Sequence, residues 1–206
     1  MKKMKIDINE EFLFSHLTQS NLENRFTFKG IEARFSKRLE NIDKSKIIEI
    51  DNYFGKNMGV KKSKKKLVKN KILSEDIFED KLNSKGEFKY KDFKGLYIFY
   101  SNGSPFYVGI SRGVLTRVQQ HTKTGKSHYS ASMAYKIACI QYELNGQETI
   151  WKRDDLSYKD NIKPVQKILQ KKQILLIPIQ NDEELYLFEV YCSIHFNTIL
   201  NKFTTH

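Results

Sequence analysis

The chain has 206 residues and is 39% hydrophobic, with 14 Phe and 11 Tyr, which is enough apolar surface for a folded core. Its 36 Lys and Arg outnumber its 24 Asp and Glu, and the formal charge of +12 favours an anionic partner such as nucleic acid or an acidic membrane surface. No apolar run approaches the length of a membrane span, and the opening MKKMKIDINEE becomes acidic where a signal peptide needs an apolar core. We therefore expect a cytoplasmic protein with no membrane partner.

The first ninety residues are predicted to be mostly helical. The stretches NEEFLFSHL and GIEARFSKRLENI place apolar residues three and four positions apart, and Asn9 can cap the first of them. We expect residues 1–90 to form a helical, lysine-rich region that binds DNA or another partner. The pattern changes after this region, so residues 91–206 are expected to form a second domain.

One segment of the N-terminal region concentrates positive charge. Residues 54–73 contain eight lysines and no acid. Such a run is typical either of a solvated linker or of an arm that follows phosphates, and the two interpretations do not exclude each other. The candidate nucleic-acid-binding residues in this segment are Lys61, Lys62, Lys64, Lys65 and Lys66.

A β-hairpin followed by helices is predicted from residue 95 onward. LYIFYS and FYVGI are short aromatic and β-branched runs, and NGSP between them is strong turn chemistry. SRGVLTRVQQH is then expected to be a helix with Ser111 as its cap. Two more helices are expected over residues 127–140 and 164–172.

The C-terminal part is predicted to add a buried strand and a last helix. ILLIPI is a continuous apolar run, in which Pro178 favours an edge position or an early end. DEELYLFEVYCSIHF begins with acids suited to a helix N-terminus. It is expected to turn toward a core the side chains of Leu185, Phe188, Tyr191, Cys192 and Ile194. Cys139 and Cys192 lack metal-type spacing and are expected to be buried thiols.

Four polar side chains of this part are expected to meet. Arg117 and His121 lie four positions apart on one predicted helix and therefore share a face. If that face packs near the hairpin, Tyr97 and Tyr107 can reach them. An arginine fork binds phosphate oxygens, and a histidine or phenol beside a cation can carry a proton, so the set suits a phosphodiester. Such chemistry is commonly assisted by a divalent ion, for which Glu189 is the best-placed carboxylate.

These residues occur in one order along the chain: Gly95-Leu96-Tyr97, Tyr107-Val108-Gly109, and then Ser111, Arg117 and His121. The order resembles the signature of the GIY-YIG nuclease superfamily, with Leu96 and Val108 in place of isoleucines. Glu189 and Asn201 are similar to the family's metal-binding glutamate and trailing asparagine, so the resemblance covers residues 95–206.

The resemblance implies a small α/β fold, with a three-stranded antiparallel sheet flanked by helices, that cleaves DNA hydrolytically with one Mg²⁺ or Mn²⁺ on Glu189. It implies that Tyr97 acts as, or helps form, the general base and that Tyr107 and His121 assist proton transfer and positioning. Arg117 would stabilise charge on the phosphate, and Asn201 completes the catalytic set. A tyrosine with an ordinary pKa of about 10 is a poor base near neutrality, so His121 is an alternative base.

Two other functions compete with a DNA endonuclease. One is a non-catalytic nucleic-acid-binding module on the same scaffold, and the other is an interaction protein whose N-terminal region recruits a partner. Cutting two antiparallel strands with one site per chain often calls for a homodimer.

His128 and His195 are expected to be ordinary surface or core histidines, and Trp151 is expected to pack or to stack on a base.

Overall fold

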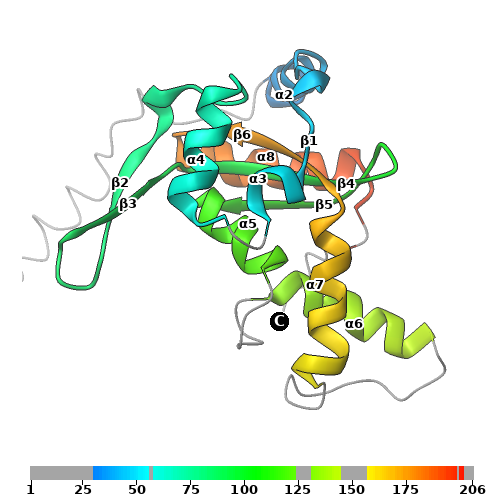
Figure 1. The fold of residues 1–206 in the computed structure, drawn as a ribbon. Helices are drawn as coiled ribbons and strands as arrows, with labels where there is room; N and C mark the ends of the chain where they lie inside the picture. Colours follow the sequence, from blue (N-terminus) through cyan, green and yellow to red (C-terminus); the bar gives the residue numbers. More distant parts are fainter. Residues whose placement is uncertain (1–29, 56–57, 124–130, 145–156, 199, 202–206) are drawn as a thin grey trace, which may run out of the picture.

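The computed structural model describes residues 30–55, 58–123, 131–144, 157–198 and 200–201, which form a mixed α/β structure (Figure 1). The main sheet is antiparallel with strand order β1-β6-β4-β5, and a separate two-stranded sheet pairs β2 with β3. The predicted α/β class is confirmed. The helix predicted near Asn9, and the residues His128 and Trp151, lie outside the described part. No helix in the described ranges is long and apolar enough to cross a membrane.

The predicted hairpin forms one side of the main sheet. β4 (Gly95–Ser101) pairs with β5 (Ser104–Ser111), and Asn102 and Gly103 turn the chain with positive φ, which these two residue types accept most easily. On its other side β4 pairs with β6 (Gln173–Pro178). β5 is therefore an edge strand.

The sheet has one strand more than the three that the sequence predicted. The short β1 (Ile48–Glu49) pairs with only the first two residues of β6. Pro178 is the last residue of β6 and lies beyond β1, so its missing N–H removes no bond to that neighbour. The prediction that Pro178 marks an early strand end is confirmed.

Side chains of the β4–β5 hairpin alternate between two faces, and each face has its own core. Leu96, Ile98 and Val108 pack with α2 (Ile31–Glu40) and α8 (Asp182–His195). Tyr97 and Phe99 pack on the opposite face. That face is covered by α3 (Ile50–Phe54), α4 (Val60–Lys69), α5 (Val114–Thr122), α6 (Ser132–Leu144) and α7 (Lys163–Gln170). Shorter helical turns are η2 (Lys44–Lys46), η3 (Glu75–Ile77) and η5 (Tyr158–Ile162).

The last helix follows its predicted pattern except at its end. Phe188 and Cys192 of α8 are buried, as predicted, and Cys139 of α6 is half-buried; both thiols are free. Ile194 is 71% exposed, so its predicted burial is wrong. Six positions after Phe188 a helix has turned well away from the apolar stripe, and this accounts for the error.

A second hairpin lies in the region that was predicted to be mostly helical. β2 (Glu79–Leu82) and β3 (Phe88–Asp92) pair antiparallel and extend away from the main sheet (Figure 1). Most of their side chains are exposed, and EDKL of β2 has no apolar alternation; Phe88 and Tyr90 of β3 do alternate with lysines, but over four residues only. The helical prediction is wrong for this hairpin and is confirmed for α2, α3 and α4.

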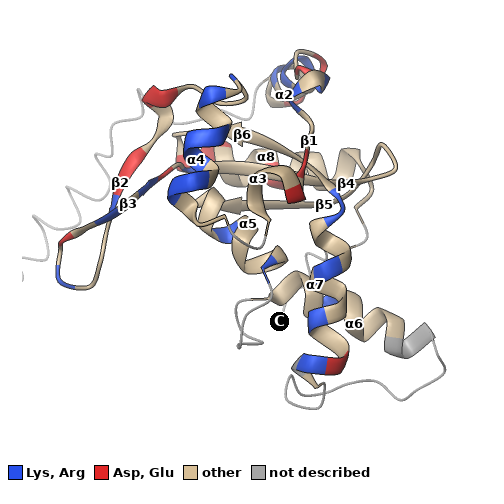
Figure 2. Cartoon of the chain, in the orientation of Figure 1, with Lys and Arg blue, Asp and Glu red and all other residues tan. Residues whose placement is uncertain are grey.

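Half of the lysine-rich segment, with six of its eight lysines, is a packed helix. Ser63 and Leu67 of α4 are fully buried, and Leu67 belongs to the same core as Tyr97 and Phe99. Six of the ten residues of α4 are lysines, which colour much of the helix blue in Figure 2. The linker interpretation is therefore wrong for α4, while its binding to phosphate stays a prediction.

The start of α5 is capped by Asp92 of β3. The Asp92 carboxylate is buried and accepts hydrogen bonds from Leu115 N at 2.9 Å, from Thr116 N at 3.0 Å and from Thr116 Oγ1 at 2.7 Å. Ser111 was predicted to be the cap, but it ends β5 and its Oγ accepts from Gly113 N ahead of the helix. A carboxylate at this position satisfies free N–H groups and complements the helix dipole. Asp92 thereby ties the second hairpin to the helix that carries Arg117 and His121.

We expect Asp92→Ala to lower the free energy of unfolding by about 2–4 kcal/mol, because it leaves several buried donors unpaired. Denaturant unfolding followed by circular dichroism measures the change. Asp80→Ala, on the same hairpin but exposed, is the control and should cost less than about 1 kcal/mol. Equal losses in the two variants would contradict the capping role.

Candidate functional site

Two glycines allow the hairpin to place Tyr97. Tyr97 of β4 lies opposite Gly109 of β5, and a Cβ at Gly109 would come within 2.5 Å of the Tyr97 Oη. A Cβ at Gly95 would come within 2.3 Å of the Ile177 carbonyl oxygen, so β6 can approach β4 closely only with glycine there. Both glycines of the sequence pattern are therefore required sterically, because the Tyr97 ring lies across Gly109 and the Ile177 carbonyl lies against Gly95.

His121 lies beneath the two tyrosines in a buried aromatic cluster. Its ring centroid is 5.9 Å from those of both Tyr97 and Tyr107, and its Nε2 shares a 3.0 Å hydrogen bond with Tyr97 Oη. The side chain is fully buried, and its Nδ1 is a buried nitrogen without a hydrogen-bond partner. Burial and, to a lesser extent, the nearby Arg117 lower the pKa of His121 to about 3. His121 is therefore neutral at physiological pH.

Arg117 extends from the same face of α5 toward the phenols. Its Nη2 donates to Ser132 Oγ at 2.8 Å and its Nη1 donates to Gln120 Oε1 at 3.1 Å, which fix the plane of the guanidinium. The group is half-buried and lines an open hollow beside the start of α5. The structure thus brings together Arg117, His121 and both tyrosines, as the sequence predicted for their geometry.

The two phenols differ in how readily they ionise. Burial raises the pKa of Tyr97 well above 10, Tyr107 raises it further, and Arg117 opposes both effects. Burial also raises the pKa of Tyr107, where Arg117 again opposes it and Glu189 adds to the rise. Tyr97 is 1% exposed, whereas Tyr107 is half-buried. Tyr107 is therefore the phenol that a solvent molecule or a ligand can reach.

Glu189 approaches this group from the other side of the sheet edge. It lies on α8, which packs against β5, and burial raises the pKa of its carboxyl from 4.5 to about 7. No group of three or more His, Cys, Asp or Glu residues in the described ranges could hold a metal ion. A single carboxylate still suits Mg²⁺, which keeps most of its waters and takes other ligands from phosphate. The residues present therefore fit one hard cation on Glu189. The positive charge of such an ion would offset the burial that raises the pKa of this carboxyl.

Asn201 holds the strand edge. Val108 N donates to its Oδ1 at 3.0 Å, and its Nδ2 donates to Val108 O at 2.7 Å. Thr198 Oγ1 donates to the same Oδ1 at 3.0 Å. The amide of Asn201 is thus occupied by the strand next to Tyr107, and it can influence the site through the position of that residue.

The five predicted lysines do not act as one set. Lys61, Lys64 and Lys65 line a hollow between α4 and β3, together with Lys69. Lys66 turns the other way, where its Nζ donates to Asn52 O. Lys62 is exposed and does not line that hollow. The structure therefore divides the predicted nucleic-acid-binding residues between two sides of the helix.

Asp92 and Ser132 are the supporting residues that the sequence did not suggest. Asp92 acts on α5 from β3 through the cap described above, and Ser132 acts from the start of α6 through its hydrogen bond to Arg117. The sequence offers one weak signal for Asp92: it is an acid that lies three residues before the predicted strand at Gly95. His195 is exposed and stacks on Tyr191 with ring centroids 5.7 Å apart, as expected for a surface histidine.

The chain matches no protein-family model, no curated protein and no solved structure. What the site can do is therefore inferred from the geometry of its side chains and from their order in the sequence.

The raised pKa of Glu189 predicts a pH-dependent stability. Because the folded pKa of about 7 exceeds the ordinary 4.5, the protonated carboxyl stabilises the fold below about pH 4.5, and this contribution is lost as the pH rises through 7. Glu189→Gln should therefore gain stability relative to the wild type between pH 4.5 and 7.5, on the order of 1 kcal/mol after discounting for partial exposure. Denaturant unfolding across this range measures the difference. The exposed Glu32→Gln is the control and should show none; a flat difference for Glu189→Gln as well would contradict its perturbed state.

Proposed function

We propose that the chain is a metal-dependent DNA endonuclease that hydrolyses phosphodiester bonds, of the GIY-YIG type that residues 95–206 resemble. The observation that supports it most is that Arg117 and the two tyrosines of the hairpin gather over one buried histidine, with Glu189 acting on Tyr107 across the strand edge. The three strands β6, β4 and β5 are consistent with that family's sheet, to which β1 adds a short fourth strand.

Arg117 would bind the phosphodiester. Its guanidinium is the cation that acts on both phenols, and it is held in plane by Ser132 and Gln120. A preorganised guanidinium stabilises the charge that develops on phosphate oxygens as the attacking water adds. The open hollow beside it leaves room for the strand to approach.

Tyr107 would carry out proton transfer at the reacting oxygen. It is the accessible phenol. Burial raises its pKa and the charge of Glu189 adds to the rise, while Arg117 and a hydrogen bond with Tyr97 offset part of it. Neutralising that carboxylate would make Tyr107 a better base. Tyr97 and His121 form a buried neutral pair that positions Tyr107, and the neutral imidazole of His121 can accept a proton once an anionic phosphodiester is bound.

Glu189 would hold one Mg²⁺ or Mn²⁺. Such an ion supplies positive charge to the phosphate and stabilises the leaving oxygen. The carboxylate itself would lose its proton on binding, since the ion replaces the countercharge that it lacks in the folded chain.

Incubation of the protein with linear, supercoiled and branched DNA tests the proposal. We expect cleavage with Mg²⁺, none with excess EDTA, and none by Glu189→Ala, whose DNA binding should stay within about threefold of the wild type because the basic surface is retained. Glu32→Ala is the matched control and should cut normally. DNA binding without cleavage under all conditions would favour the non-catalytic module instead.

Mg²⁺ should also raise the melting temperature of the wild type at pH 7.5 and leave that of Glu189→Ala unchanged.

Arg117→Ala should lower the single-turnover rate of cleavage by at least about two orders of magnitude, because the guanidinium acts mainly on the transition state. Arg117→Lys should recover little, because lysine lacks the planar fork. Folding of both variants is checked by circular dichroism. A decrease below threefold in a folded Arg117→Ala protein would remove Arg117 from the mechanism.

A further inference from the structure

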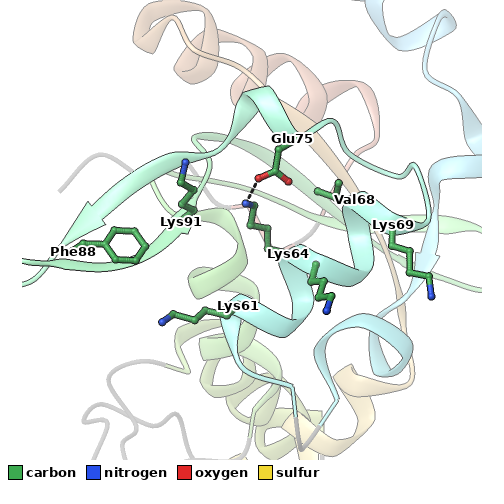
Figure 3. Close-up of a pocket in the computed structure, with 8 residues that line it drawn as sticks. Lys61, Lys64, Val68, Lys69, Glu75, Phe88 and Lys91 are labelled. Carbon is green, nitrogen blue, oxygen red and sulfur yellow. Dashed lines mark hydrogen bonds and ion pairs between the residues drawn. The ribbon is translucent and has the colours of Figure 1, made fainter.

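A second hollow lies between α4 and β3 and takes no part in the site described above. Its volume is about 600 Å³, large enough for one unit of a nucleic-acid strand. Figure 3 shows Lys61, Lys64 and Lys69 from the helix and Phe88 and Lys91 from the strand around it. Helix and hairpin thus contribute to one concave surface.

The rim of this hollow is basic. Lys64 forms an ion pair with Glu75, the one acid among the lining residues. Lys91 also forms an ion pair, with 3.5 Å between its Nζ and Asp80 Oδ1. The other three lysines of the rim have no ion pair among the described residues. They are Lys61, Lys65 and Lys69. Three uncompensated ammonium groups within about two turns of helix favour an anion, and phosphates are the anions that a nucleic acid supplies.

Part of the lining of the hollow is apolar. Val68 and the ring of Phe88 line it, and Phe88 is 56% exposed although it is a large aromatic residue. Lys61 Nζ lies 5.9 Å from the centre of the ring. Phosphate alone gives no reason for an exposed aromatic ring at this position, whereas a base stacks on such a ring while lysines hold its phosphates.

The exposed ring also discriminates between forms of nucleic acid. In a duplex the base faces are stacked on one another, and a basic surface meets only sugars and phosphates. An unpaired nucleotide presents a free base face. The hollow therefore suits a single strand better than a duplex.

We propose that the hollow between α4 and β3 binds a single-stranded segment of nucleic acid, with a base stacked on Phe88 and phosphates on Lys61, Lys65 and Lys69. This inference rests on the proposed function, for which it names the substrate class: DNA with an unpaired segment, such as an overhang, a flap or a branch. The same hairpin lines the hollow that contains Arg117, through Leu82 and Tyr90, so a strand held on Phe88 lies next to the reactive side of the molecule.

Binding of a fluorescently labelled oligothymidylate to the full chain in EDTA tests the proposal, since no cutting interferes. Phe88→Ala should weaken binding by roughly 5- to 150-fold, the range for removal of one stacked base. Ile168→Ala is the matched control: Ile168 of α7 is 56% exposed, as Phe88 is, but it lines neither this hollow nor the one that contains Arg117. It should bind within about twofold of the wild type.

Two further variants separate stacking from apolar contact. Phe88→Tyr should bind like the wild type, and Phe88→Leu should bind like Phe88→Ala, because leucine keeps the apolar volume without a ring. In Phe88→Trp the added indole fluorescence should be quenched by the oligonucleotide. Lack of quenching, or equal affinity of Phe88→Ala and Ile168→Ala, would overturn the inference.

Charge is tested separately. Changing Lys61, Lys65 and Lys69 to Gln should reduce the salt dependence of oligonucleotide binding by up to about 0.7 log-log units for each phosphate that is no longer neutralised. The control changes three exposed lysines in the α2–η2 part of the chain, Lys37, Lys44 and Lys46, and should leave the slope unaltered. Equal slopes in both triple variants would overturn phosphate binding in the hollow.

A blunt duplex of the same length decides the substrate class. Phe88→Ala should leave duplex binding within about twofold of the wild type, and an equal decrease in affinity for duplex and single strand would overturn the preference for a single strand.

The results also separate this inference from the proposed function. DNA cleavage with binding that is independent of Phe88 would refute only the hollow, and binding that depends on Phe88 without cleavage in Mg²⁺ would refute only the nuclease.

Discussion

The fit of the Tyr97 ring across Gly109 is the constraint on which the rest of the site depends. It turns one phenol of the central strand toward the edge strand and leaves its oxygen 3.0 Å from His121 Nε2. Any side chain at residue 109 would occupy the same space. The distance between the hairpin and α5 is therefore set by one aromatic ring, and Arg117, one helical turn before His121, takes its position from that distance.

Around this contact the site is organised by burial more than by ion pairing. His121, Tyr97 and Glu189 are all shifted toward their neutral forms, chiefly because they are withdrawn from water. Arg117 is the cation that acts on the phenols and the histidine. Groups shifted toward their neutral forms around one fixed positive charge favour an anionic ligand. The binding of such a ligand would change the pKa of each of these groups.

The sequence predicted this part of the molecule well because its signals are local. Glycine, tyrosine and turn residues define the β4–β5 hairpin, and a spacing of four puts Arg117 and His121 on one face. Longer-range features had no such signal. Asp92 caps a helix that begins more than twenty residues later, so nothing next to that helix in the sequence marks the cap. The side chains of β2 are mostly exposed and do not alternate, and the alternation in β3 spans only four residues. Whether α4 was a spacer or a packed helix depended on where Leu67 is buried, which only the tertiary structure decides.

The bidentate contact of Asn201 with Val108 has a consequence for association. An edge strand offers free N–H and C=O groups to any other extended chain, and proteins commonly block such edges against intermolecular sheet growth. Here a side-chain amide imitates the peptide group of a neighbouring strand at the middle of β5, at N–O distances of 3.0 and 2.7 Å. A second copy of the chain therefore cannot extend the main sheet past Val108 without displacing Asn201. Two copies that meet on one DNA would have to associate through other surfaces.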